Sequence, residues 1–197
     1  MKSKGFTLIE LAVVLAIIAV LAAILTPIVT GYLDQARVAR AQADAKTIAD
    51  AIKLYQRDTG RWPVYASASD FSSNTIAGAK TLIGGNSGSN PADGAVTWGV
   101  GAAIASSSLE TYLNGNFTNL STTIAFPKAA FRGPYIASLD SDPWGNKYLL
   151  TASNLAGTAN HAYVISAGPN GLLDTTVNQG AAQPFAVGSD DIVSVIR

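Results

Sequence analysis

The chain has 197 residues and a formal net charge of zero, from 13 basic and 13 acidic residues. This balance excludes the strongly basic surface that is typical of nucleic-acid-binding proteins. The absence of cysteine excludes disulfide bonds and thiol chemistry, and beyond an apolar N-terminal segment the length is that of one small domain.

The first thirty residues combine a basic leader with a long apolar segment. Lys2 and Lys4 precede an apolar run from Phe6 to Val29. As a helix this run is about 36 Å long, which is enough to cross a hydrocarbon layer of about 30 Å. The positive leader predicts a single-pass inner-membrane anchor with a cytoplasmic N-terminus and an exported remainder.

One charged residue, Glu10, interrupts the apolar segment. A carboxylate inside a membrane helix costs up to about 3 kcal/mol at mid-bilayer and less near an end. Val13, Val14 and Ile17, in the next two helical turns, offer it no partner. We therefore expect the partner of Glu10 in another chain.

The stretch from Gly5 to Leu11, GFTLIEL, resembles the class III signal of type IV pilins and of the pseudopilins of type II secretion. The resemblance implies a prepilin peptidase and N-methyltransferase that cuts after Gly5 and methylates Phe6. It also implies that Glu10 neutralises the N-terminal amine of a neighbouring subunit in a helical filament. The alternative is an ordinary signal peptide cut near Ala22, but a glutamate and a Gly-Phe junction are unexpected there.

The helix is predicted to continue beyond the membrane, from Phe6 to about Asp58, because apolar residues keep helical spacing on one face. These residues are Val38, Ala41, Ala45, Ile48, Ile52 and Tyr55. The leader (1–5) is then followed by a transmembrane and assembly half (6–30) and an amphipathic half (31–60). Pro27 and Gly31 predict a bend. Two separate helices are the alternative.

The globular domain is predicted to cover residues 61–197. Ser, Ala, Asn and Gly dominate an insert at 66–130, in which only a short helix at Ser107–Leu113 is expected and to which we assign no role. Short segments rich in β-branched and aromatic residues follow at Lys147–Ala152, Ala162–Ala167 and Ile192–Ile196. The predicted fold class is α+β, a type IV pilin-like fold in which the long helix packs on a small antiparallel sheet.

A second motif runs from Gly133 to Tyr148 and includes the sequence DPWGN. It is similar to the pattern that precedes the β-region of the major pseudopilin of type II secretion. Asp142-Pro143 and Gly145-Asn146 are turn signals, and Trp144 is expected to fill the core between helix and sheet. We interpret the motif as structural.

The C-terminal loop, residues 168–191, is long for a small domain and has no cysteine to tether it. It is rich in the oxygen ligands that calcium prefers. The resemblance implies a structural Ca2+ ion here, for which the candidate ligands are Asn170, Asp174, Asp190 and Asp191. A solvated acidic turn is the alternative.

No catalytic residues are predicted. His161 is the single histidine and lies at the start of a predicted strand, which fits no serine–histidine–aspartate arrangement. The chain also has no phosphate-binding loop and no histidine pair for a transition metal.

The resemblance implies a structural filament subunit, a pseudopilin, that polymerises through its N-terminal helix into a periplasmic pseudopilus for type II protein secretion. The implied partners are further copies of the chain, the peptidase and N-methyltransferase, and an assembly platform with its ATPase. The membrane holds the subunit before assembly, and no nucleic acid is expected. A surface type IV pilin for adhesion or external contacts is the alternative, and an anchored calcium-binding module that never polymerises is a more distant one.

Overall fold

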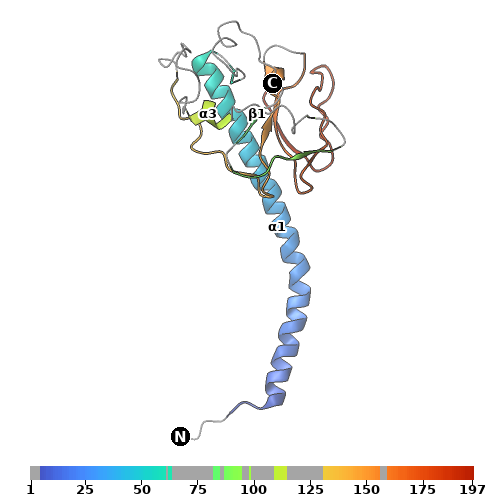
Figure 1. The fold of residues 1–197 in the computed structure, drawn as a ribbon. Helices are drawn as coiled ribbons and strands as arrows, with labels where there is room; N and C mark the ends of the chain where they lie inside the picture. The colour runs from blue at the N-terminus through green and yellow to red at the C-terminus, as the bar shows by residue number, and fades with distance from the viewer. Residues whose placement is uncertain are drawn as a thin grey trace. The chain divides into compact units, whose positions relative to one another are not determined.

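The structure is a computed structural model that describes residues 5–60, 62–63, 82–84, 87–94, 98, 109–114, 131–155 and 159–197. It divides into two compact units, Met1–Arg37 and Val38–Arg197, which are described in turn (Figure 1). Most of the predicted leader and most of the predicted insert lie outside the described residues.

The long helix α1 spans Leu8–Thr59 without interruption, so the alternative of two separate helices is wrong (Figure 1). It begins two residues later than expected, because Thr7 is its N-terminal cap. Inside the helix, Pro27 has no N–H to donate to the carbonyl of the preceding turn. Next to Pro27, the Thr26 hydroxyl donates to the Ala22 carbonyl (2.7 Å), and the Thr30 hydroxyl donates to the Pro27 carbonyl (3.0 Å).

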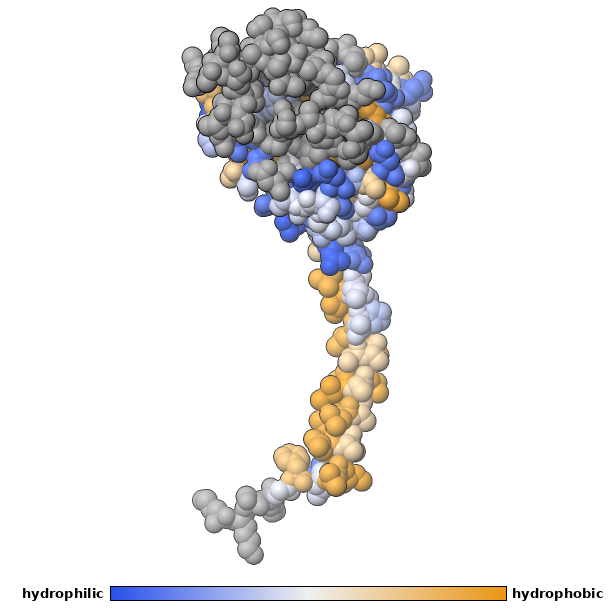
Figure 2. Space-filling model, viewed as in Figure 1, coloured by the Kyte–Doolittle hydropathy of each residue, from blue (hydrophilic) through white to orange (hydrophobic). Residues whose placement is uncertain are grey.

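In the first unit the apolar side chains of α1 are exposed. The helix contains an 18-residue window with a mean hydropathy of 3.1, and none of that window is buried in the chain. Figure 2 shows this surface as a continuous apolar band. By length and composition the segment suits a membrane span, and exposed apolar area of this extent indicates a membrane or a protein interface.

The second unit contains a four-stranded antiparallel sheet of order β1-β3-β4-β6, which confirms the predicted kind of sheet. Its strands are β1 (Leu82–Ile83), β3 (Leu149–Leu150), β4 (Tyr163–Ser166) and β6 (Ile192–Val195). β4 pairs with β6, which aligns Tyr163 with Val195, and with β3, which aligns Ile165 with Leu149. β1 comes from the predicted insert, which therefore completes the sheet.

Three further elements complete this unit. A two-residue parallel pair joins β2 (Ala92–Asp93) to β5 (Leu172–Leu173), so the predicted insert also contacts the C-terminal loop. The helix α3 (Leu109–Asn114) coincides with the described part of the predicted helix at Ser107–Leu113. A 3-10 turn, η2 (Ala152–Leu155), follows β3 and makes that strand shorter than expected.

Both faces of the sheet are buried, as the alternation along β4 shows. Val164 faces a cluster built on α1, whereas Tyr163 and Ile165 face a second cluster that includes Trp98. The first cluster contains Ala45, Ile48, Ile52, Tyr55, Tyr112, Leu113, Tyr148 and Leu150. The sequence predicted the first cluster and missed the second.

The prediction that Trp144 fills the core is wrong. Its side chain is only partly buried and, among the described residues, packs against neither cluster. It sits in the turn that Asp142 organises, where the backbone reverses at the surface. The core volume is filled by tyrosines on and near the strands, such as Tyr148 and Tyr163.

Trp98 is instead the tryptophan on which stability depends. It is 5% exposed, packs edge-on against Tyr163, and its indole N–H donates to the Thr175 carbonyl (2.7 Å). We expect Trp98→Ala to lower the free energy of unfolding by about 3–5 kcal/mol and Trp144→Ala by less than about 1 kcal/mol. Urea denaturation of residues 38–197, which hold every buried residue described, measures both values. A larger effect at Trp144 would contradict this assignment of the core.

Burial also predicts a loss of stability in alkali. It raises the pKa of Tyr148 and of Tyr163 well above the usual value, and Tyr148 donates to the Asp44 carboxylate (3.3 Å). Because the folded state holds these protons more tightly, stability is fully present below about pH 10 and falls as the pH rises further. Urea midpoints between pH 8 and 11 measure the slope. The double Tyr148→Phe, Tyr163→Phe variant should flatten it, and an unchanged slope would contradict the prediction.

Candidate functional site

The N-terminus of α1 is closed by a reciprocal cap between Thr7 and Glu10. The backbone N–H and the hydroxyl of Thr7 both donate to Glu10 Oε2 (2.8 Å each), and the Glu10 N–H donates to Thr7 Oγ1 (3.3 Å). This is a capping box, whose sequence signature is Ser or Thr followed three residues later by Glu. The expectation that Glu10 has no partner in its own chain is therefore wrong, and the Thr7-x-x-Glu10 spacing carried the signal.

The predicted processing junction precedes this cap. Gly5 and Phe6 lie outside the helix, and the Phe6 side chain is 88% exposed. A peptide bond outside regular structure is accessible to a peptidase, so the geometry is compatible with cleavage after Gly5. Gly5 and Phe6 precede the Thr7 cap directly, and their predicted roles and that of Glu10 remain predictions.

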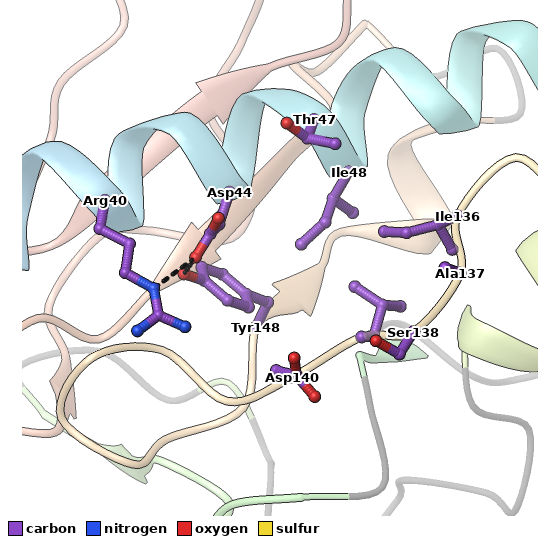
Figure 3. A pocket seen from close by; sticks show the side chains of 10 residues that line it. Arg40, Asp44, Thr47, Ile48, Ile136, Ala137, Ser138, Asp140 and Tyr148 are labelled. Atoms are coloured by element: carbon purple, nitrogen blue, oxygen red, sulfur yellow. Dashed lines mark hydrogen bonds and ion pairs between the residues drawn. The ribbon is translucent and has the colours of Figure 1, made fainter.

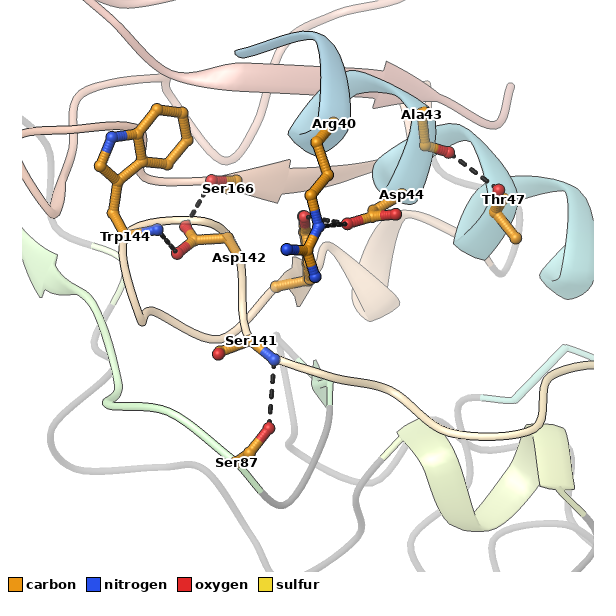
Figure 4. Close-up of polar contacts among 10 residues, drawn as sticks. Arg40, Ala43, Asp44, Thr47, Ser87, Ser141, Asp142, Trp144 and Ser166 are labelled. Atoms are coloured by element: carbon orange, nitrogen blue, oxygen red, sulfur yellow. Dashed lines mark hydrogen bonds and ion pairs between the residues drawn. The ribbon is translucent and has the colours of Figure 1, made fainter. Parts of the chain in front are cut away.

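The DPWGN motif forms a turn around the carboxylate of Asp142. This carboxylate is 3% exposed; its Oδ1 accepts from the backbone N–H groups of Trp144 (3.0 Å) and Asn146 (2.7 Å). Its Oδ2 accepts from the hydroxyl of Ser166 at the end of β4 (2.6 Å; Figure 4). Asp142 thus joins the turn to the sheet, and the motif is structural, as expected.

Side-chain amides fix the C-terminal loop in this cysteine-free chain. Buried Asn154 donates to the carbonyls of His161 (3.0 Å) and Val177 (2.9 Å). Gln179 exchanges two hydrogen bonds with the backbone of Ala186 (2.6 and 2.7 Å), which closes the segment between them. These amides supply the tether that the sequence left unassigned.

The four predicted calcium ligands form two contacting pairs. The Asn170 N–H donates to Asp190 Oδ2 (3.0 Å), while Asn170 Oδ1 accepts from the Leu172 N–H (2.7 Å). The Asp174 N–H donates to Asp191 Oδ2 (2.9 Å), and the Thr175 N–H donates to the same oxygen (2.6 Å). Each aspartate of the 190–191 pair therefore has one oxygen bound to the start of the loop.

The other oxygen of each aspartate has no partner. Among the described residues, Asp190 Oδ1 and Asp191 Oδ1 are buried without a hydrogen bond. Burial raises the pKa of the Asp191 carboxyl, and the charge of Asp174 adds to this rise, although the hydrogen bonds from Thr175 and from the Asp174 backbone act against it. Within the described ranges no three acidic or histidine side chains gather as a ready-made metal cage. Two orphaned carboxylate oxygens on neighbouring residues nevertheless fit a cation, because buried charges are normally paired or bound to metal.

Gly94, which follows β2 in the predicted insert, contacts the C-terminal loop. Its N–H donates to the Leu173 carbonyl (3.0 Å), and a side chain at this position would collide with Asp174 Oδ1 and with that carbonyl. The absence of a side chain thus lets the two backbones approach. No sequence pattern pointed to this contact.

His161 takes no catalytic position in the described part of the structure. Its Nδ1 lies 3.3 Å from the Arg197 carbonyl, and its ring packs edge-on against Phe185. The residue is partly exposed, as expected, and lies two residues before β4 rather than in the strand.

Comparison with known proteins first identifies the class. Residues 1–26 match the family profile described as the prokaryotic N-terminal methylation motif. The matched residues include the first part of the long helix α1, and a small antiparallel sheet follows, as expected of a type IV pilin-like protein; the resemblance stated from the sequence is therefore confirmed.

Individual relatives narrow the class further, and several are named type II secretion system core protein G. The Pseudomonas aeruginosa protein is 27% identical over 156 residues, which cover 79% of this chain and 78% of that protein. Those of Dickeya chrysanthemi and Escherichia coli are each 25% identical over 174 residues, or 88% of this chain and 82% and 87% of theirs. No solved structure matches the chain at a significant level.

Proposed function

We propose that the chain is a structural subunit of a periplasmic pseudopilus that serves type II protein secretion. The observation that carries the proposal is the methylation motif at the exposed apolar start of α1, in a chain similar to core protein G over most of its length. The alternative of a surface pilin rests only on the insert, and the described parts of that insert pack into the fold as β1, β2 and α3. The role assigns no catalytic residue.

The proposed mechanism uses the N-terminal unit twice. In the membrane, the apolar segment of α1 anchors the subunit with its leader on the cytoplasmic side. After cleavage behind Gly5 and methylation of Phe6, the same surface packs against the helices of other subunits, which offsets the loss of lipid contact. Glu10 then meets the amine of a neighbour in a medium of low dielectric constant, where an unpaired charge is costly.

The proposed partners follow from this cycle. A prepilin peptidase and N-methyltransferase processes the junction, and an assembly platform with a cytoplasmic ATPase adds subunits to the growing filament. The subunit resides in the inner membrane with its second unit in the periplasm until it joins the pseudopilus. Support for membrane residence is the length and hydropathy of the α1 segment.

Calcium is the cofactor proposed for the loop 168–191. Asp190 and Asp191 would hold it through their orphaned oxygens, with Asn170 or Asp174 and backbone carbonyls completing the set. Bound there, the ion would neutralise the adjacent carboxylates of Asp190 and buried Asp191 and tie the end of the loop to its start. Its contribution would be structural, because it would stiffen the loop.

Deletion of the gene tests the proposal in the native organism. We expect exported proteins to accumulate in the periplasm, and wild-type protein supplied in trans to restore their release. Surface pili, twitching and adhesion should be unchanged. Loss of surface pili with normal secretion would favour the surface-pilin alternative and overturn the proposal.

A further inference from the structure

A cavity of about 240 Å³ lies between α1 and the segment 136–140 of the second unit (Figure 3). Its lining combines apolar side chains, from Ile48, Ile136 and Leu139, with the charged groups of Arg40, Asp44 and Asp140. A cavity lined by both apolar side chains and carboxylates suits a long basic side chain, whose stem packs on the apolar groups while its charged head meets the acids.

Among the charged groups that line the cavity, one carboxylate has no described partner and is available for an incoming cation. Asp44 accepts from the Tyr148 hydroxyl (3.3 Å) and lies 3.5 Å from Arg40 Nε, so Arg40 neutralises it (Figure 3). The carboxylate of Asp140 is exposed and makes no hydrogen bond or ion pair with any residue that the structure describes. Two carboxylates against one guanidinium leave the cavity with a net negative charge.

The opposite flank of α1 carries the complementary group. Lys46 follows Asp44 by two positions, which turns its side chain by about 200° around the helix axis. It is exposed and, in the described part of the chain, its ammonium has no acidic partner. Val187, which is 50% exposed, lines the same groove as Lys46, together with Gln42 and residues 191–194.

We infer that the cavity beside Asp140 receives the Lys46 side chain of a second copy of the chain. A contact between two different flanks of the same molecule is heterologous, and repetition of such a contact builds an open helical filament rather than a closed dimer. The inference rests on the proposed function, because it names the contact that would set the register of the globular units along the filament. The Glu10 pairing does the same for the N-terminal helices.

Charge reversal in the full-length chain, in a host that supplies the assembly machinery, tests the pairing. We expect Lys46→Glu and Asp140→Lys each to reduce the yield of sheared filaments by about tenfold and the double variant to restore it. Lys53→Glu is the matched control: it makes the same charge change on α1 outside the groove, at a lysine already 3.8 Å from Asp50. Single variants that assemble at wild-type yield would overturn the inference.

Cross-linking tests whether a second copy of the chain occupies the cavity. Because the chain has no cysteine, only the introduced cysteines can react. In filaments of the Lys46→Cys, Asp140→Cys double variant, a short bismaleimide should yield a ladder of covalent oligomers. Each single-cysteine variant, and Lys53→Cys combined with Asp140→Cys, should yield none. Filaments without a ladder, or adducts only with other proteins, would overturn the inference and leave the proposed function intact. Failure of the wild-type chain to form any filament would overturn both.

Discussion

Glu10→Ala should leave the protein processed and anchored but reduce its filament yield by at least about tenfold, because the amine of each incoming subunit then enters a low-dielectric core unpaired. Cleavage of the leader is measured from the mass of the mature N-terminal peptide. Anchoring is read from membrane fractionation, and assembly from sheared filaments. Filaments at wild-type yield would show that the charge of Glu10 plays no part in assembly.

The capping box requires further variants, because Glu10→Ala removes the observed helix cap together with the proposed inter-subunit charge. Glu10→Gln keeps an acceptor for the Thr7 donors but removes the charge, whereas Thr7→Val removes the hydroxyl of the cap and keeps the charge. If inter-subunit pairing dominates, Glu10→Gln assembles as poorly as Glu10→Ala and Thr7→Val assembles better than either. The reverse order would assign the effect to the helix cap, which contributes about 1 kcal/mol.

Calcium should raise the melting temperature of residues 38–197 by about 5–10 °C when it is present at one hundred times its dissociation constant, and a chelator should reverse the change. The physical reason is that the proposed ion would bind two buried carboxylate oxygens that no group among the described residues satisfies. Differential scanning calorimetry with and without chelator, together with a calorimetric titration, measures the effect.

Variants of the loop locate the ion. Asp190→Ala and Asp191→Ala should each abolish the calcium-dependent shift, although Asp191→Ala also loses the backbone contacts to Asp174 and Thr175. The readout is therefore the difference between the calcium and chelator scans of each variant. Asp50→Ala, on the exposed face of α1, is the control and should keep the full shift. An unchanged melting temperature and no heat of binding in the wild-type protein would remove calcium from the account.

Long periodic patterns made much of the fold predictable. The apolar spacing that ends at Tyr55 fixed the buried face of α1, and the β-branched segments became β3, β4 and β6. The short strands β1 and β2 and the burial of Trp98 could not be predicted. Two-residue strands have no period, and their pairing partners lie far along the chain.

The candidate sites were predictable to a different degree. Glu10 stood out as a single charge in an apolar segment, and its cap with Thr7 was readable from the spacing alone. Asp190 and Asp191 stood out as a pair of hard ligands. The choice between Asn170 and Asp174 depends on how the loop folds back, and there the amide contacts of Gln179 and Asn154, which no local pattern encodes, decide the path. The prediction for Trp144 was wrong because the residue belongs to a turn at the surface, which keeps its side chain out of the core.

The most direct test of the central claim, that residues 6–29 serve as an assembly device, is a helical reconstruction of filaments formed by the processed full-length chain. The account predicts a core of bundled helices in which the Glu10 carboxylate lies within about 4 Å of the methylated amine of Phe6 in a neighbouring subunit. Filaments whose core excludes these helices, or in which Glu10 faces solvent, would contradict it.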